Sequence, residues 1–285
     1  MLLITIAHLL NVLLVFAMPI GLAVYLTHRF HSGWRLWWIG AGTFVLSQAG
    51  HIPFNWAASL VLNRTALVLW PAASQQLFNA VFLGLSAGLF EELFRYGMYR
   101  WWAKDARNWS QGLLTGAGHG GAEAILIVGL PVLLAFINMS LARLPAIQAT
   151  LTQGQLQAVN AYWSAPWYAD LMGAVERFFA IIFQIALSLL VLQTFTRRQP
   201  FWLWLAVLIH ALSDFTALLA ETHLGVYWTE AIVGLFAISG VIIIFALRQE
   251  EPAAHDEPDA GRPHPTIGPI PPDESPDKLD QTRYL

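Results

Sequence analysis

Two adjacent glutamates and an arginine lie in an otherwise apolar stretch of the chain. The segment LFEELFRYGMYR begins at Leu89 and carries Glu91, Glu92 and Arg95. An ionised side chain in apolar surroundings costs several kcal/mol unless it is paired or given a polar pocket. Other segments of the chain must therefore supply partners for these three groups.

Two further segments each place a carboxylate four residues after a histidine. TGAGHGGAEA contains His119 and Glu123, and HALSD contains His210 and Asp214. In a helix, this spacing puts both side chains on the same face. A glutamate and a neutral histidine beside a cavity can activate a water molecule for hydrolysis, the glutamate accepting the proton. The second histidine and its aspartate could then stabilise an oxyanion.

The same groups leave a metal site open as an alternative. Two histidines and two carboxylates can bind zinc and keep a free coordination position, and the ligands would be His119, Glu123, His210 and Asp214. The chain has no cysteine and no HExxH motif, so a zinc signature is missing from the sequence. We therefore predict chemistry without a cofactor and keep zinc as the alternative.

More polar side chains occur in the same apolar segments and are assigned a supporting role. Counting about 1.5 Å of helix rise per residue from the predicted cytoplasmic ends puts most of them at a similar depth as the glutamates and histidines. This predicts one cavity in the inner half of the membrane, with Glu176 and Arg177 bracing it from further out. The supporting residues are Gln48, His51, Asn55, Arg95, Glu123, Glu176, Arg177 and Gln184.

The composition shows what kind of chain must position these residues. Hydrophobic residues make up 56% of the 285 residues and charged residues only 12%, whereas soluble domains carry about 25% charged residues. This indicates an integral membrane protein whose partners include membrane lipids. A formal net charge of −3 gives no basic surface for nucleic acid.

Seven apolar segments are long enough to cross a bilayer, which predicts an all-α, multi-pass helical bundle. The first segment has no basic region before it and continues for about 25 residues, so we predict a retained helix rather than a signal peptide. The segments lie near 2–26, 36–62, 72–102, 110–138, 167–194, 200–220 and 226–247.

The distribution of basic residues predicts the orientation. The odd-numbered loops and the residue after the last segment hold eight lysines and arginines, and the even-numbered loops hold only Arg64 and Arg143. The positive-inside rule then places the amino terminus outside and the carboxyl terminus in the cytoplasm. We predict that the protein lies in the plasma (inner) membrane.

The chain is predicted to have two parts. Residues 1–248 form the transmembrane domain. Residues 249–285 are rich in proline and contain nine acidic residues against three basic ones. Such a segment cannot bury enough apolar surface to fold, so we predict a disordered cytoplasmic tail.

The order of these motifs resembles the YhfC family of intramembrane proteases. That family is in turn similar to the glutamic-type intramembrane proteases, which include the CAAX prenyl endopeptidases and PrsW. The resemblance covers most of residues 40–220. It is carried by EExxR (Glu91, Glu92, Arg95), GHGGxEA (His119, Glu123), the pair Glu176–Arg177, HxxxD (His210, Asp214) and GHxxFN (Gly50, His51, Phe54, Asn55).

The resemblance implies a general-base pair made by one glutamate with His119, and an oxyanion-stabilising pair, His210 with Asp214. It leaves the choice of glutamate open. Motif order favours Glu91, because the glutamic-type proteases space their second glutamate four residues before the arginine. Helix geometry favours Glu92, because an i,i+4 ion pair with Arg95 would neutralise Glu91.

From residues and resemblance together, we predict a glutamic-type intramembrane peptidase that cleaves a peptide bond near the cytoplasmic side. Three alternatives remain. A zinc-dependent protease would use the same residues. A proton-coupled transporter would use the buried acids as a relay and would need broken helices. A non-catalytic membrane binding protein would tolerate loss of the acids and histidines.

Overall fold

The computed structural model describes residues 2–248, and the predicted tail, 249–285, lies outside this range. Every regular element in the described part is helical, as the sequence predicts. The longer elements are α1 (Leu2–Arg29), α2 (Arg35–Leu62), α3 (Ala72–Gly97), α4 (Trp109–Glu123), α5 (Leu130–Leu141), α7 (Gln153–Ser164), α9 (Met172–Thr196), α10 (Phe201–His223) and α11 (Val226–Ala246). The short ones are η1 (Ala66–Leu69), η2 (Met98–Trp102), η3 (Ala124–Gly129), α6 (Pro145–Gln148) and α8 (Trp167–Asp170).

Six helical stretches are long and apolar enough to cross a membrane, compared with the seven segments expected. They are Leu2–Arg29, Ala72–Trp102, Trp109–Leu141, Trp167–Thr196, Phe201–His223 and Val226–Ala246. The remaining segment, α2, is a helix of 28 residues but is not among the candidates. Its polar residues, among them Gln48, His51 and Asn55, dilute the apolar signal.

The fourth span continues without a break through its glycine-rich region. An Asn108–Gln111 capping box starts α4, which runs to Glu123. The π-helical turn η3 follows directly, and α5 begins at Leu130 with Pro131 in its first turn. Pro131 has no N–H to donate to the preceding turn, and it directly follows the π-helical turn η3, so the helical stretch passes through the proline without a break. The broken helix that a transporter would need does not occur at this span.

The connection between α5 and α8 contains the helices α6 and α7. A capping box formed by Thr152 and Gln155 starts α7. The ring of Tyr162 on α7 stacks on His8 of α1 with centroids 4.1 Å apart. This contact fixes the connection against the first helix.

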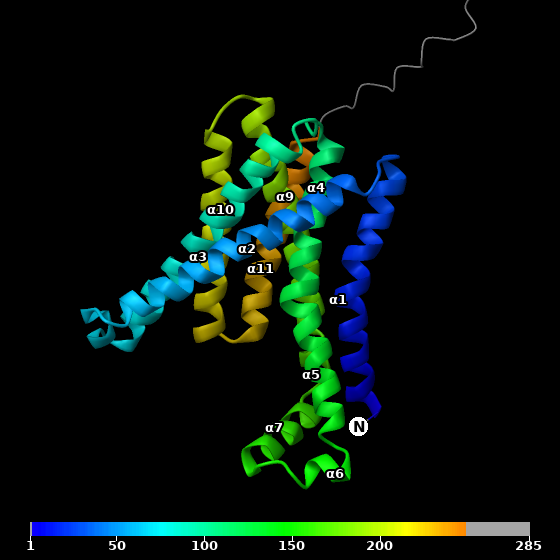
Figure 1. Cartoon of the computed structure of the whole chain (residues 1–285), viewed down its shortest axis with the longest axis vertical. Helices are drawn as coiled ribbons and strands as arrows, with labels where there is room; N and C mark the ends of the chain where they lie inside the picture. The colour runs from blue at the N-terminus through cyan, green and yellow to red at the C-terminus, as the bar shows by residue number, and fades with distance from the viewer. Residues whose placement is uncertain (1, 249–285) are drawn as a thin grey trace, which may run out of the picture. The chain divides into compact units, whose positions relative to one another are not determined.

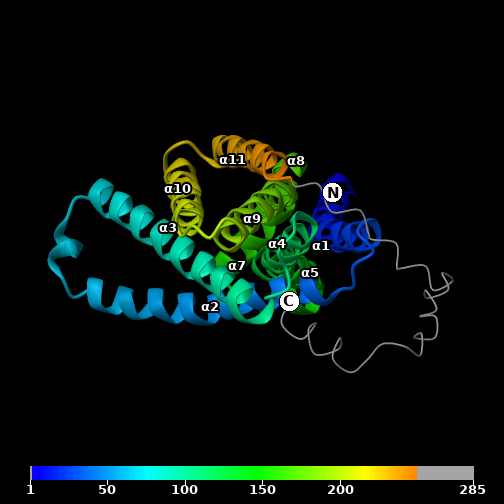
Figure 2. The ribbon, with the colours of Figure 1, turned by 90° about the horizontal axis from the view of Figure 1, so that it is seen from above.

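Helices α3 and α10 pack along each other, and so do α2 and α4. Helix α9 contacts both α4 and α11, which places α4 and α9 between the other spans (Figure 1, Figure 2). The candidate site residues predicted from the sequence lie on α2, α3, α4, α9 and α10. The packing therefore joins all five helices that carry them, because α3 also contacts α2 and α9, and α9 also contacts α10.

Glycines make two of these contacts close. A Cβ atom at Gly40 of α2 would lie 2.0 Å from the backbone oxygen of Thr115 on α4, and one at Gly118 would lie 2.0 Å from that of Trp37. On α3, a Cβ at Gly88 would lie 2.7 Å from the backbone oxygen of Val207 on α10. Backbones approach this closely only where side chains are absent, as in other membrane helix pairs.

Gly40 and Gly42 offer a matched test of the α2–α4 contact. We expect Gly40→Ala to destabilise the protein by about 2 kcal/mol, because the added methyl group meets backbone that cannot move aside. Gly42→Ala, two residues further on, adds its methyl group to open space and should leave stability unchanged. Thermal unfolding in detergent measures both, and equal midpoints for the two variants would contradict the tight packing.

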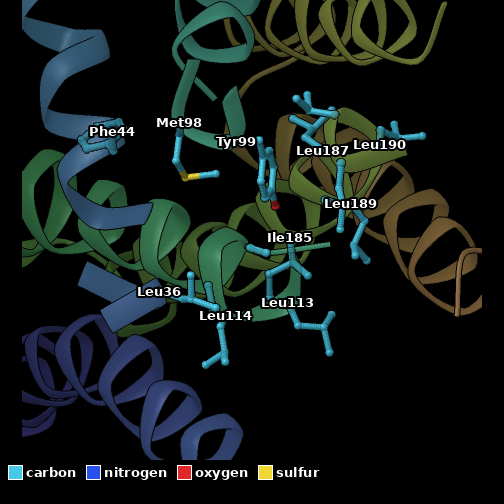
Figure 3. Close-up of a cluster of buried hydrophobic side chains, with 14 of the residues drawn as sticks. Leu36, Phe44, Met98, Tyr99, Leu113, Leu114, Ile185, Leu187, Leu189 and Leu190 are labelled. Atoms are coloured by element: carbon cyan, nitrogen blue, oxygen red, sulfur yellow. The ribbon is translucent and has the colours of Figure 1, made fainter. Parts of the chain in front are cut away.

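The apolar core adjoins a small group of hydroxyls. Leu113, Leu114, Leu187 and Leu189 are buried around Tyr99, and Figure 3 shows the tyrosine oxygen among these side chains. This oxygen is hydrogen-bonded to Thr115 Oγ1 at 2.6 Å and to Ser188 Oγ at 2.8 Å. The hydroxyls satisfy one another and join η2 to α4 and α9.

Basic side chains of three predicted cytoplasmic segments stack on aromatic rings from other segments. The guanidinium groups of Arg107, Arg197 and Arg248 lie 4.8, 4.7 and 5.6 Å from the rings of Phe195, Trp202 and Trp109. These contacts gather the three segments at one end of the bundle. That this end faces the cytoplasm stays a prediction.

Candidate functional site

Glu91 of α3 is the centre of a buried polar cluster. Its Oε1 accepts a hydrogen bond from Gln48 Nε2 at 3.0 Å, and its Oε2 lies 3.0 Å from His119 Nε2. The Gln184 amide donates to the same Oε2 at 3.3 Å, and His210 Nε2 lies 4.0 Å from it. Side chains of α2, α4, α9 and α10 thus converge on one carboxylate.

Arg95 pairs with Glu92 and not with Glu91. Its Nη1 lies 2.5 and 2.6 Å from the two carboxylate oxygens of Glu92. The i,i+4 pairing of Arg95 with Glu91 that helix geometry suggested is therefore wrong. The reason lies on α9, where the Gln184 side-chain oxygen accepts from Arg95 Nη2 at 2.6 Å and holds the guanidinium beside the i,i+3 glutamate.

Glu92 and His210 form the second half of the cluster. His210 Nδ1 lies 2.8 Å from Glu92 Oε1. With that nitrogen donating to the carboxylate, His210 Nε2 points towards Glu91 and lies 3.7 Å from Asp214 Oδ2. Glu92 is fully buried at 0% exposure. Its carboxylate is bonded to Arg95 and His210.

Gln184 connects the central cluster to a second group of charges. Its nitrogen donates to Glu123 Oε2 at 2.6 Å. Glu123 Oε1 accepts from Arg177 Nη1 at 2.9 Å, and Arg177 also pairs with Glu176. The expected brace of Glu176 and Arg177 is thus joined to the site through Glu123.

A cavity of about 120 Å³ opens beside the cluster. Glu91, His210 and Asp214 line it, together with Glu123 and Gln184. His119 and Glu92 do not line it. Of the two neighbouring glutamates, Glu91 is the one that a molecule in this cavity would touch.

His51 and Asn55 lie next to the cluster rather than in it. His51 Nε2 is 3.0 Å from Ser86 Oγ and 2.8 Å from Asn55 Nδ2. The sequence predicted that His51 and Asn55 lie near the site, but it gave no indication of Ser86. It also missed Tyr99 and Thr115, although Tyr99 lies four residues after Arg95 on the same helical stretch and gives a usable signal.

The alternative zinc ligands do not gather around one point. No group of three or more His, Asp or Glu side chains within residues 2–248 has a geometry that could hold a metal ion. Glu123 is already bonded to Arg177 and Gln184, and His210 Nδ1 is directed at Glu92. The donor set His119, Glu123, His210 and Asp214 therefore does not fit a zinc ion in this arrangement.

Apolar spans enclosing a buried cluster of carboxylates and histidines define the class, an integral membrane protein of the intramembrane protease type. Residues 14–237 match the family described as YhfC intramembrane metalloprotease, and the chain belongs to this family. It is 34% identical over 212 residues to a protein of Bacillus subtilis (strain 168) named "Uncharacterized membrane protein YhfC", covering 72% of this chain and 81% of that protein. No solved structure matches the chain.

Proposed function

We propose that the chain is a glutamic-type endopeptidase that hydrolyses a peptide bond within the membrane. One observation carries the proposal. Glu91 faces a cavity of about 120 Å³ while four nitrogen-bearing side chains surround its carboxylate. A buried water molecule occupies about 30 Å³, so water and the reacting carbonyl group fit beside this carboxylate.

In the proposed reaction, Glu91 accepts a proton from the water as its oxygen attacks the peptide carbonyl carbon. His119 lies behind Glu91, where its Nε2 holds the carboxylate in position at 3.0 Å. His210 presents Nε2 to the cavity beside Asp214. With both ring nitrogens protonated, His210 donates a hydrogen bond from Nδ1 to Glu92 and can donate one from Nε2 to the oxyanion, which stabilises the tetrahedral intermediate without transfer of that proton. The proton held by Glu91 then passes to the leaving amine.

The proposal also covers the class of substrate and the side of the membrane on which cleavage occurs. The substrate is a peptide or membrane protein that reaches the site from the lipid phase. Cleavage occurs on the cytoplasmic side of the plasma membrane, since the arginine-rich end of the bundle is proposed to face the cytoplasm.

Hydrolysis by water is tested with the reconstituted full-length protein and membrane-embedded candidate substrates in H₂¹⁸O. We expect new peptide termini, with one ¹⁸O atom in the new carboxyl group, detected by mass spectrometry. Intact substrates after long incubation, over a broad set of apolar sequences, would contradict the proposed function.

The family description names a metal, so a separate prediction concerns zinc. We expect a strong chelator to leave cleavage unchanged, because the described donors do not converge on a metal position. The measurement compares cleavage rates with and without chelator and determines bound zinc in the purified protein by mass spectrometry. Stoichiometric zinc together with loss of cleavage on chelation would support the zinc protease instead.

A further inference from the structure

A second and larger cavity adjoins the first. It has a volume of about 360 Å³ and is lined from α2, α3, α9, α10 and α11. Glu176, Asp214, Ala217 and Val233 line both cavities, so the two spaces meet at Asp214. The first cavity has room for water molecules and the second for side chains of a substrate.

The walls of the second cavity are apolar with acidic groups set among them. Leu83, Ala87 and Leu218 provide apolar surface. All its charged lining residues are carboxylates, and they come from Glu176, Asp214 and Glu221. Neither lysine nor arginine lines it, and His51 is its remaining ionisable group.

Two carboxylates, Glu221 in this lining and Glu230 next to it, form no ion pair with another described residue. Within the described residues, Glu221 makes no hydrogen bond or ion pair. Glu230 is nine-tenths buried on α11 between the lining residues Thr229 and Val233, and its Oε2 has no hydrogen-bond partner. A buried carboxylate oxygen without a partner is costly, and a positive charge brought into the neighbouring space would lower this cost.

We infer that this cavity is a specificity pocket that takes a lysine or arginine side chain of the peptide substrate. The inference rests on the proposed peptidase function and adds its substrate class. Long basic side chains match both features of the pocket, since the aliphatic stem packs on apolar walls and the charged head reaches the acids. Glu221 is the specificity-determining residue, because Glu176 is already paired with Arg177.

The helix that connects the two cavities sets the position of the basic residue. Asp214 and Glu221 are seven residues apart on α10, which corresponds to about 10 Å along the helix axis. An extended peptide covers this length with about three residues. We therefore expect the basic residue within about three positions of the cleaved bond, on one side of it.

Binding tests the pocket without requiring cleavage. The full-length Glu91→Gln variant is reconstituted in nanodiscs and titrated with apolar peptides that carry one lysine, or glutamine at the same position, scanned over three positions on each side of the bond. At one position, the lysine peptide should bind about tenfold more tightly. Combining Glu91→Gln with Glu221→Gln should remove this preference, and combining it with Glu221→Lys should shift it to peptides that carry glutamate.

A matched control removes a carboxylate elsewhere. Asp105→Asn in the same background changes the net charge equally, but Asp105 is exposed and paired with Arg35, so the lysine preference should persist. Equal binding of lysine and glutamine peptides at every position would overturn the inference that the cavity is a pocket for a basic side chain.

Cleavage by the otherwise native protein separates this inference from the proposed function. Hydrolysis of lysine and glutamine peptides at equal kcat/KM would overturn the pocket and leave the peptidase standing. A lysine preference in binding without hydrolysis of any peptide would support the pocket and contradict the peptidase.

Discussion

The Glu91→Gln variant should lose peptide cleavage by about three orders of magnitude, in keeping with the removal of a general base. Glutamine keeps the shape of the side chain and can still accept hydrogen bonds from its neighbours, but it cannot take the proton of the attacking water. The fold should survive, because Arg95 is neutralised by Glu92 and does not depend on this carboxylate. Cleavage rates under saturating substrate, together with a thermal unfolding curve, measure both expectations.

The control for this variant is Glu123→Gln. Glu123 lines the same cavity but is tied to Arg177 and Gln184, so its replacement should lower cleavage by less than about tenfold. Equal losses in the two variants would mean that the general base is not Glu91. Retention of full cleavage by Glu91→Gln would refute the glutamic-type mechanism.

The Arg95→Met variant should show the largest loss of stability of any substitution proposed here. Arg95 is 1% exposed and satisfies both oxygens of Glu92. Its removal leaves a buried carboxylate with His210 as its remaining partner, and breaking such a pair costs about 3–5 kcal/mol. Thermal or denaturant unfolding in a mild detergent should reveal this loss as a much lower midpoint.

Two comparisons separate loss of charge pairing from loss of side-chain bulk. Arg100→Met removes an exposed arginine five residues further on and should leave the midpoint nearly unchanged. The double variant Arg95→Met/Glu92→Gln removes the unpaired charge as well and should regain part of the lost stability. If the double variant is no more stable than Arg95→Met, buried charge is not the cause of the loss.

Much of the architecture follows from the apolar runs alone. A chain inside lipid must satisfy its backbone groups within each segment, so long apolar runs predict helices, and the helical fold is confirmed. Counting residues along those helices also placed His119, Gln184 and His210 at one depth and Gln48 about one turn deeper. The structure brings all four to Glu91, although their catalytic roles stay predictions.

The partner of Arg95 could not be predicted from the sequence. Glutamates three and four residues before an arginine both lie within its reach on a helix. The choice between them depends on Gln184, which lies on another helix and accepts from the second guanidinium nitrogen. The role of Ser86 was hidden for the same reason, because its partner His51 comes from a different helix.

The spacing of the site along the chain has a consequence for biosynthesis. Glu91 and His119 enter the membrane early, whereas His210 on α10 follows His119 by about 90 residues and Glu91 by about 120. Until α10 packs along α3 through Gly84 and Gly88, the cavity lacks the wall that carries His210 and Asp214. In a ribosome-bound chain the candidate site is thus incomplete, and the proposed activity would begin only once nearly all of its spans have been inserted.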